Sequence, residues 1–217
     1  MIEHVYRRAS EATRVSRVIV ATDDVRVFEA VRAFGGDVVM TSAHHRTGSE
    51  RVAEVAAQIA DDLIVNVQGD EPMLAPAMID DAVAACVADP SVMMSTVRSR
   101  ITDPAEIASP AVVKVVVDLR GRALYFTRAA VPFLRDPGTP VTWYKHVGLY
   151  VYRREFLLAC AAWPATPLEM SESLEQLRAL EHGHAIMTVE SRHEALGVDT
   201  PDDLERVRRR LAAPTTT

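Results

Sequence analysis

The stretch Leu63-Ile64-Val65-Asn66-Val67-Gln68-Gly69-Asp70-Glu71-Pro72 decides the fold of this chain. Four of its first five residues are apolar, which is the pattern of a strand buried on both faces of a parallel sheet. Gly69 then permits close approach of a backbone or ligand, and Pro72 ends any further ladder pairing. The polar residues of this turn are therefore predicted to lie at the carboxyl end of a central strand, where open α/β sheets bind ligands.

Carboxylates at such an edge suit a magnesium ion. Mg²⁺ usually takes one or two protein carboxylates and fills its other positions with water and substrate phosphates. Asp70 and Glu71 are the candidates here. The plainer interpretation is that both acids merely solubilise a tight turn. The concentration of polar side chains in the turn at this strand end favours a functional site.

Bulk composition narrows the class of protein. The 217 residues suit one α/β domain, and 48% hydrophobic with 25% charged residues is typical of a soluble globular chain. A net charge of −6 argues against a general nucleic-acid surface, and no apolar run approaches the ~20 residues of a membrane span. There is no signal-peptide pattern, and Cys86 and Cys160 are interpreted as reduced core thiols. We therefore expect a cytoplasmic protein that binds neither nucleic acid nor membrane.

Two βα units in succession follow an opening amphipathic helix that begins near Ile2. The first has a strand over 17–22 and a helix that starts at Asp23-Asp24 and runs to Phe34, and the second has a strand over 37–40. This order predicts a parallel sheet with right-handed crossovers. In the next loop, Thr47 and Glu50 predict a capping box, and the helix start could hold an anion or the edge of a nucleotide.

Three later segments carry further polar chemistry. In 146–153 the residues alternate, so that His146, Gly148, Tyr150 and Tyr152 share one strand face that lines water or a ligand. The stretch 167–178 predicts one helix, with its leucines inward and its carboxylates in solvent.

The third segment is a helix start near Thr200 and Pro201. Asp202 and Asp203 favour the positive end of that helix. Asp199 lies one step outside the cap, so helix formation leaves it unexplained. Its side chain could supply a second carboxylate ligand for the metal.

Several of these blocks resemble the 3-deoxy-manno-octulosonate cytidylyltransferase (CMP-Kdo synthetase) family of lipopolysaccharide biosynthesis. The first is Asn66-Val67-Gln68-Gly69-Asp70-Glu71-Pro72. The others lie in the family's order over nearly the whole chain, and they are the loop ending in Arg51, Ala123 to Pro132, His146 to Arg153, and Gly197 to Val207.

The resemblance implies a fold, a reaction and an assembly. The fold is a Rossmann-like nucleotidyltransferase (GT-A-like) three-layer sandwich with a mainly parallel sheet and a small antiparallel sugar-binding and dimerisation portion, all in one domain over 1–217. The reaction is transfer of a cytidylyl group from CTP to Kdo, with in-line attack of the anomeric hydroxyl and release of pyrophosphate. Such a transfer needs positioning and charge neutralisation more than covalent chemistry. The family also suggests a homodimer.

The resemblance further implies the site residues. Asp70 and Asp199 would be the catalytic pair that holds Mg²⁺. The residues facing the sugar acid would be Gln68, Arg128, His146, Tyr150, Glu175 and Gln176. Those embracing the nucleotide would be Gly48, Ser49 and Arg51, although Arg51 could also be a plain helix-surface charge.

The chain departs from the family at its beginning. The family opens with a strand and a loop of the type Pro-Ala-Arg…Ser-Thr-Arg-Leu-Pro-Gly-Lys, whereas this chain begins where that loop has finished. The two lysines, Lys114 and Lys145, do not lie in a glycine-rich loop, and Ala111 stands where the family tends to carry Asn. We therefore expect an N-terminally incomplete domain whose flanking strands carry unpaired N–H and C=O groups.

Four interpretations of this departure stay open. The reading frame could start too late, or the chain could be a shortened relative that has lost activity. It could be a non-catalytic binding or assembly partner. It could also serve another sugar acid, such as a sialic acid.

Overall fold

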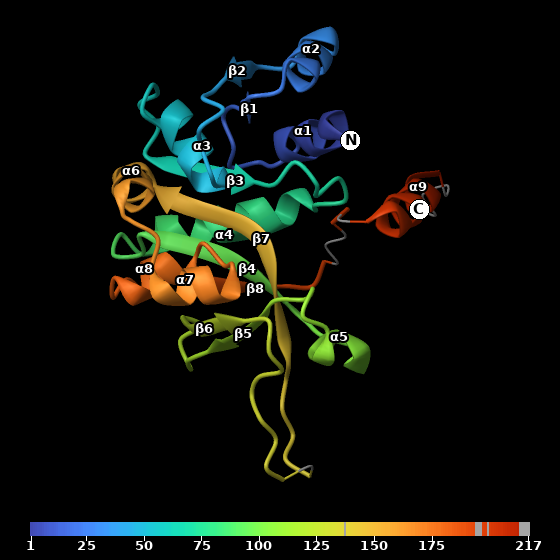
Figure 1. Cartoon of the computed structure of the whole chain (residues 1–217), viewed down its shortest axis with the longest axis vertical. Coiled ribbons are helices and arrows are strands. Elements are labelled where there is room, and N and C mark those ends of the chain that lie inside the picture. The colour runs from blue at the N-terminus through green and yellow to red at the C-terminus, as the bar shows by residue number, and fades with distance from the viewer. Residues whose placement is uncertain (137, 194–196, 199, 213–217) are drawn as a thin grey trace.

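The computed structural model describes residues 1–136, 138–193, 197, 198 and 200–212. Helices and strands alternate along the first half of the chain, as the sequence predicted (Figure 1). In chain order the elements are α1 (Ile2–Ser10), β1 (Val20–Thr22), α2 (Val25–Ala33), β2 (Val38–Met40), α3 (Gly48–Ala56), β3 (Leu63–Val67), α4 (Pro76–Ala88), β4 (Met94–Arg100), α5 (Pro104–Ala108), β5 (Lys114–Val117), β6 (Ala123–Thr127), β7 (Tyr144–Arg153), α6 (Arg154–Ala162), α7 (Pro167–Glu172), α8 (Leu177–Glu181), β8 (Met187–Ser191) and α9 (Pro201–Ala212).

The main sheet is mixed rather than mainly parallel. Its order is β6-β5-β7-β4-β8, and β3 also pairs with β7. The β4–β8 ladder is parallel, whereas β7 runs antiparallel to β3, β4 and β5. The prediction of an α/β fold is therefore confirmed, and the pairing within the sheet is corrected. Residue alternation along a strand carries no information about its direction, so the antiparallel β7 could not be read from the sequence.

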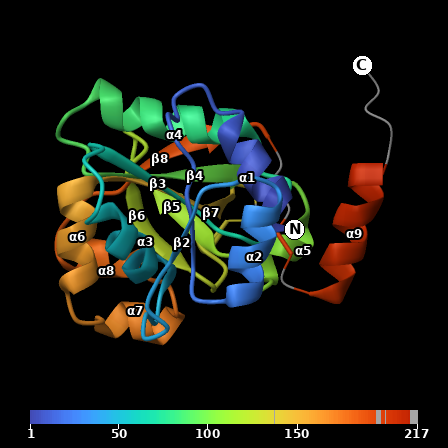
Figure 2. The same ribbon diagram turned by 90° about the horizontal axis from the view of Figure 1, so that it is seen from above.

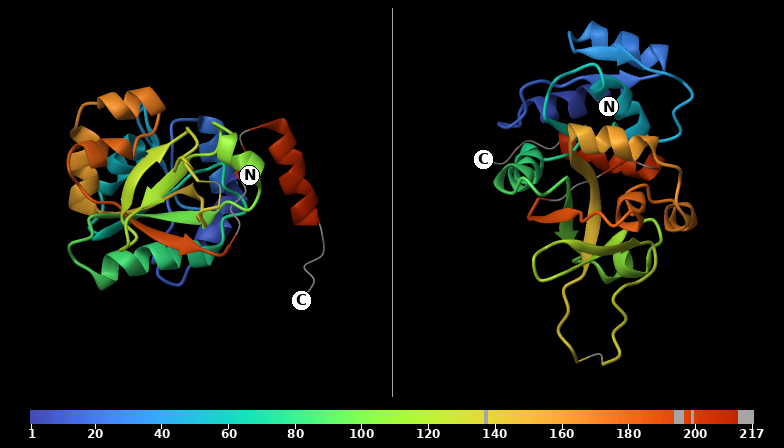
Figure 3. Two further views of the ribbon diagram at one scale, coloured as in Figure 1. Left: turned by 90° about the horizontal axis from the view of Figure 1, so that it is seen from below. Right: turned by 90° about the vertical axis from the view of Figure 1, so that its left-hand side faces the viewer.

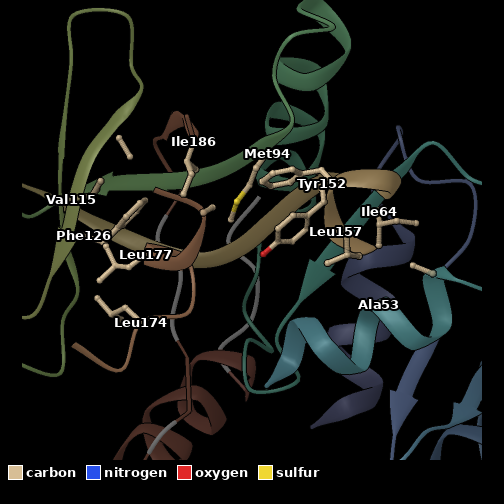
Figure 4. Packing of buried hydrophobic residues seen from close by; sticks show 14 residues of the cluster. Ala53, Ile64, Met94, Val115, Phe126, Tyr152, Leu157, Leu174, Leu177 and Ile186 are labelled. Atoms are coloured by element: carbon tan, nitrogen blue, oxygen red, sulfur yellow. The ribbon is translucent and has the colours of Figure 1, made fainter. Parts of the chain in front are cut away.

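Two hydrophobic clusters cover the two faces of the sheet and produce three layers (Figure 2). Ile64 and Tyr152 belong to the cluster that packs under α3 and α6, where Figure 4 shows them beside Leu157. Val65 packs against the other cluster, which includes residues of α4. Because neighbouring residues of β3 contact opposite clusters, the prediction that this strand is covered on both faces is confirmed.

The sheet is interrupted between β1 and β3. β1 pairs in parallel with β2 in a separate two-stranded sheet, and no ladder in the described part of the chain joins it to β3. In Figure 1 the β1–β2 pair lies above β3. A cavity of about 720 Å³ lies between them, lined on its two sides by residues 18–21 and 63–69. Among the described residues, β1 forms a ladder with β2 and β3 with β7, and neither forms one on the side that faces the cavity.

The predicted helix over 167–178 is wrong at its centre. It breaks into α7 and α8 at Ser173, whose φ of 53° lies in the left-handed region. Leu174 and Leu177 do point into the core, as predicted (Figure 4). The carboxylates do not all face solvent, because Glu169 is buried. The break places Glu175 and the residue after it in a turn instead of on a helical face.

The lower part of the molecule is a small antiparallel portion. β5 and β6 pair as a hairpin, and a long loop excursion between β6 and β7 extends away from the body (Figure 1). α9 lies to one side of the body (Figure 3). Among the helices of the described residues, none combines the length and the apolar character needed to cross a bilayer.

Candidate active site

Gln68 stands at the carboxyl end of β3, directly beside the start of α3. A Cβ added to Gly48 would lie only 3.3 Å from Gln68 Nε2, and one added to Gly148 would lie 3.6 Å from Gln68 Cγ. The side chain is therefore held between two glycines. Its Nε2 donates to Asn66 Oδ1 over 3.3 Å. A side chain at position 48 would push against this amide, which the family resemblance implies faces the sugar acid.

An aromatic row follows β7. The ring centroids of His146 and Tyr150 are 5.2 Å apart, and those of Tyr150 and Tyr152 are 5.9 Å apart, so the predicted strand face is confirmed. Burial raises the pKa of both tyrosine hydroxyls. Both phenols therefore stay neutral and can act as hydrogen-bond donors at neutral pH.

The tautomer of His146 follows from its partner. Thr96 Oγ1 donates its single proton to the Leu149 carbonyl over 2.7 Å, so it must accept from His146 Nε2, which lies 2.9 Å away. Nδ1 is then the acceptor nitrogen of a neutral ring. Burial lowers the pKa of His146 to about 3. With so low a pKa, the ring can accept a hydrogen bond from a hydroxyl but is a weak general base.

This pKa predicts a pH dependence of stability. The folded ring stays neutral down to about pH 3, while an unfolded histidine takes up a proton below pH ~6.5. The unfolded state then binds more protons, so the free energy of unfolding falls with decreasing pH. The contribution approaches about 1.4 kcal/mol per pH unit within this window. We expect His146→Asn to flatten the slope by that amount in urea titrations between pH 4 and 6.

His44→Asn is the matched control, because it removes an imidazole from an exposed loop position. The slope of the free energy of unfolding against pH also contains contributions from the many carboxylates that titrate in acid. The difference in slope between wild type and His146→Asn isolates the contribution of this one histidine. Equal slopes for wild type and His146→Asn would contradict a ring kept neutral by burial.

Two buried amide donors find no acceptor among the described residues. They are Asn66 Nδ2, on a residue 3% exposed, and Gln176 Nε2, on a residue 5% exposed. An unsatisfied buried donor costs about 1–3 kcal/mol. Such donors are explained if a ligand with oxygen acceptors binds there. Gln176 was predicted from the family pattern, whereas Asn66 was missed, although it is the polar residue that interrupts the apolar run of β3.

Glu175 joins two distant parts of the chain. Its Oε1 accepts from Thr47 Oγ1 over 2.8 Å, and Ser49 at the start of α3 also hydrogen-bonds to it. Burial raises the pKa of this carboxyl, against the opposing effect of these bonds. The structure therefore connects the helix start predicted to hold the nucleotide with the turn predicted to hold the sugar.

Arg128 is fixed at the end of β6. Its Nε donates to the Glu172 carbonyl over 2.9 Å, and its main-chain N–H donates to the Glu172 carboxylate over 2.9 Å. Lys114 lies beneath it, fully buried, and donates to the Arg128 carbonyl over 2.6 Å. Burial and the neighbouring Arg128 charge lower the pKa of Lys114. Lys145 is paired with Glu106 over 2.6 Å.

Arg51 is more than a surface charge. Its guanidinium donates to Thr41 Oγ1 over 2.7 Å and to the Ser42 carbonyl over 3.2 Å, and it pairs with Asp23 over 3.0 Å. These bonds tie α3 to the loops after β1 and β2. Arg51 also lines the cavity between β1 and β3.

The turn after β3 is joined to the segment before α9. The Asp70 carbonyl accepts from the Val198 N–H over 2.9 Å. Asp199 itself lies outside the described residues, so its side chain is not placed. This main-chain hydrogen bond places Val198 beside Asp70. Carboxylate oxygens, such as those of Asp70, are ligands that suit Mg²⁺. Among the described residues no set of three or more histidine, cysteine or acidic side chains forms a metal cluster.

Comparisons with known proteins identify the family of this chain. The family model described as cytidylyltransferase matches residues 1–188. The 3-deoxy-manno-octulosonate cytidylyltransferase of Geobacter metallireducens is 56% identical over 98% of this chain and 87% of its own length. The chain belongs to the 3-deoxy-manno-octulosonate cytidylyltransferase family. The Geobacter sulfurreducens relative of the same name is 54% identical over 97% of this chain and 88% of its own.

Solved structures show the same fold. A structure of CMP:2-keto-3-deoxy-manno-octonic acid synthetase complexed with CTP matches with a TM-score of 0.92 and 42% identity, over 97% of this chain and 87% of that one. The 4-diphosphocytidyl-2C-methyl-D-erythritol synthase of Anaerococcus prevotii matches with a TM-score of 0.63 at 11% identity, over 98% and 89%. The second likeness shows the fold alone.

Proposed function

We propose that this chain transfers the cytidylyl group of CTP to the sugar acid Kdo and releases pyrophosphate. Two observations carry the proposal. The polar site near β3 contains buried amide donors that have no acceptor among the described residues, and the chain belongs to this family. The anomeric hydroxyl of the sugar loses its proton to solvent, and its oxygen forms a bond to the α-phosphorus. The bond from that phosphorus to the bridging oxygen breaks, and pyrophosphate leaves with the electron pair.

The residues of the site would hold the sugar acid rather than react with it. The amides of Asn66 and Gln176 can donate to its carboxylate or hydroxyls, and Tyr150 can donate its phenolic proton. His146 Nδ1 can accept from a hydroxyl. Glu175 and Gln176 form the turn between α7 and α8, here called the sugar turn. Glu175 would hold this turn in a fixed position relative to the start of α3, because its carboxylate is hydrogen-bonded to Thr47.

Magnesium is part of the proposal. Asp70 would hold it, with Asp199 as the proposed second ligand, and the join between Asp70 and Val198 supports that pairing. When bound, Mg²⁺ neutralises phosphate charge and lowers the pKa of a coordinated hydroxyl. The start of α3, including Gly48, Ser49 and Arg51, would face the nucleotide.

A substrate panel tests the proposal. Pyrophosphate release is measured with CTP, UTP or ATP against Kdo or a sialic acid, in the presence of Mg²⁺. We expect release only with CTP and Kdo together. Turnover with the sialic acid in preference to Kdo would identify a different sugar acid, and nucleotide binding without turnover of any pair would indicate a non-catalytic partner.

Gln176→Met separates binding from stability. The change removes a buried unsatisfied donor and keeps a similar side-chain volume, so we expect an unchanged or raised Tm. Loss of one hydrogen bond to the sugar should raise the KM for Kdo by about 10-fold to 100-fold and leave the KM for CTP unchanged. Calorimetric melting and steady-state kinetics measure the two effects. A lowered Tm would show that the amide has a structural partner.

We further propose a homodimer formed through the small antiparallel portion. It is supported by exposed apolar side chains there, with Leu124 on β6 62% exposed and Phe133 in the excursion 89% exposed. A cytoplasmic location is also a proposal, and it is supported by two cysteines that are both free thiols.

A further inference from the structure

Lys114, the first residue of β5, is a buried cation that donates only to main-chain carbonyls. The residue is 0% exposed. Its Nζ lies 2.7 Å from the carbonyl oxygen of Ser109 and 2.6 Å from those of Val112 and Arg128. Three acceptors require all three protons of the ammonium form, so every donor of this side chain is used within the chain. Lys114 therefore cannot donate to a ligand without giving up one of these bonds.

Two of the three bonds are local. Ser109 and Val112 belong to the turn between α5 and β5, here called the 109–112 turn, and the bonds from Lys114 close it. The third bond crosses to the end of β6, 14 residues further along the chain. It holds the main chain at Arg128, the residue that the family resemblance implies faces the sugar acid. Closing a turn explains the first two bonds but not the third.

The Arg128 side chain rests on the same turn. Its Nη1 donates to the Pro110 carbonyl over 3.0 Å, and Pro110 lies between the two residues of the turn whose carbonyls Lys114 holds. Lys114 thus fixes both the main chain that carries this guanidinium and the turn that supports it. In the described part of the chain the Arg128 Nη2 makes no hydrogen bond, so its two protons remain available to a ligand with oxygen acceptors.

The charges at this position favour an anionic ligand. Lys145 is paired with Glu106, whereas Lys114 forms no ion pair among the described residues. Burial and the charge of Arg128 lower the pKa of Lys114, and Glu172 acts in the opposite direction. Two cations therefore share one carboxylate. A buried charge without its own counterion is costly, and the carboxylate of a sugar acid would balance the surplus.

We propose that Lys114 is a positioning residue for the sugar-acid site, where it orients the Arg128 guanidinium toward the ligand by holding the Arg128 carbonyl and the 109–112 turn. The inference rests on the proposed function and on the position that the family resemblance implies for Arg128. Lys114 acts through Arg128 and does not touch the sugar acid itself. A purely structural lysine would differ in its effect, because its loss would weaken CTP and Kdo binding alike.

The test compares the unmodified chain with Lys114→Met, Arg128→Met and the variant that combines them. Lys145→Met is the matched control, because Lys145 lies directly opposite Lys114 on β7 and loses the same charge. Calorimetry measures the Kd for Kdo and the Kd for Mg²⁺–CTP separately, and steady-state kinetics measures kcat. The Kd for Kdo needs no turnover. Kdo binding by the unmodified chain without turnover would therefore contradict the proposed function and leave this comparison readable.

We expect Lys114→Met to raise the Kd for Kdo by about 10-fold to 100-fold, because a displaced guanidinium no longer meets the ligand. The Kd for Mg²⁺–CTP should stay within about twofold of the unmodified value, and Lys145→Met should leave both constants within the same range. When Arg128 is already methionine, Lys114→Met should have little further effect on the Kd for Kdo, since the residue through which it acts is gone.

Three results would overturn the proposal. They are an unchanged Kd for Kdo in Lys114→Met, equal weakening of Kdo and CTP binding, and losses in the combined variant that multiply. Lys114→Met leaves three carbonyls without a donor, so a lowered Tm is expected under either reading and does not decide between them. If Lys114→Met does not fold, Lys114→Gln replaces it, because the amide keeps two protons for these carbonyls. Failure of both variants to fold would assign Lys114 to stability alone and would also overturn the proposal.

Discussion

Replacing Asp70 with asparagine is expected to lower kcat for CMP-Kdo formation by at least ~10²-fold. The carboxylate stands in the turn that ends β3, and its main chain is bonded to the segment that precedes Asp199. If Asp70 holds Mg²⁺ as proposed, the change removes one charged ligand, which weakens Mg²⁺ binding and leaves phosphate charge unneutralised in the transition state. Because Asp70 lies in a turn outside both hydrophobic clusters, stability should change by no more than about 1 kcal/mol.

The measurements are steady-state kinetics and calorimetric binding of Mg²⁺–CTP. Asp62→Asn is the matched control, because it removes the same charge from the amino end of the same strand, at an exposed position. It should behave as wild type. Unchanged Mg²⁺–CTP binding and unchanged turnover in Asp70→Asn would remove Asp70 from the metal site.

Replacing Arg178 with methionine is expected to destabilise the fold by about 3–5 kcal/mol. The guanidinium is 2% exposed and forms two bonds to the Glu169 carboxylate, of 2.8 and 2.5 Å. Burial is the largest single influence and acts to raise the pKa of Glu169, but the hydrogen bonds from Arg178 and Thr166 and the charge of Arg178 together outweigh it, so the pKa is lowered and the pair is ionised. Methionine would leave a buried carboxylate without its cation.

Urea denaturation measures this effect, and a double-mutant cycle separates its causes. Glu169→Gln combined with Arg178→Met removes both charges, so the double variant should lose less stability than the sum of the two single changes. Additive losses would show that the two side chains act independently. Since the pair fastens α7 to α8, the single variants should also disturb the sugar turn between these helices.

Local rules predicted much of the secondary structure. Asp24 and Thr47 accept main-chain N–H groups at the starts of α2 and α3, as expected of capping residues. The apolar run of β3 and the turn that ends it lie where the pattern placed them. These features depend on neighbours within a few residues, which the sequence displays directly.

Other features depend on contacts that no local pattern carries. The break at Ser173 was missed because the apolar spacing continues across it and a serine gives no signal for positive φ. The bond between Thr47 and Glu175 joins residues 128 apart in sequence. Asn66 interrupts the apolar run of β3 in the sequence, but coordinates are needed to recognise that its buried amide donor has no hydrogen-bond acceptor.

The central claim is that this chain joins Kdo to the α-phosphate of CTP. The most direct measurement is ³¹P NMR of the purified chain mixed with CTP, Kdo and Mg²⁺, followed over time. We predict that a single phosphodiester signal from CMP-Kdo and the signal of pyrophosphate grow in equal amounts as CTP disappears, and only when Kdo is present. Persistence of CTP, or its conversion to products without a sugar phosphodiester, would contradict the account.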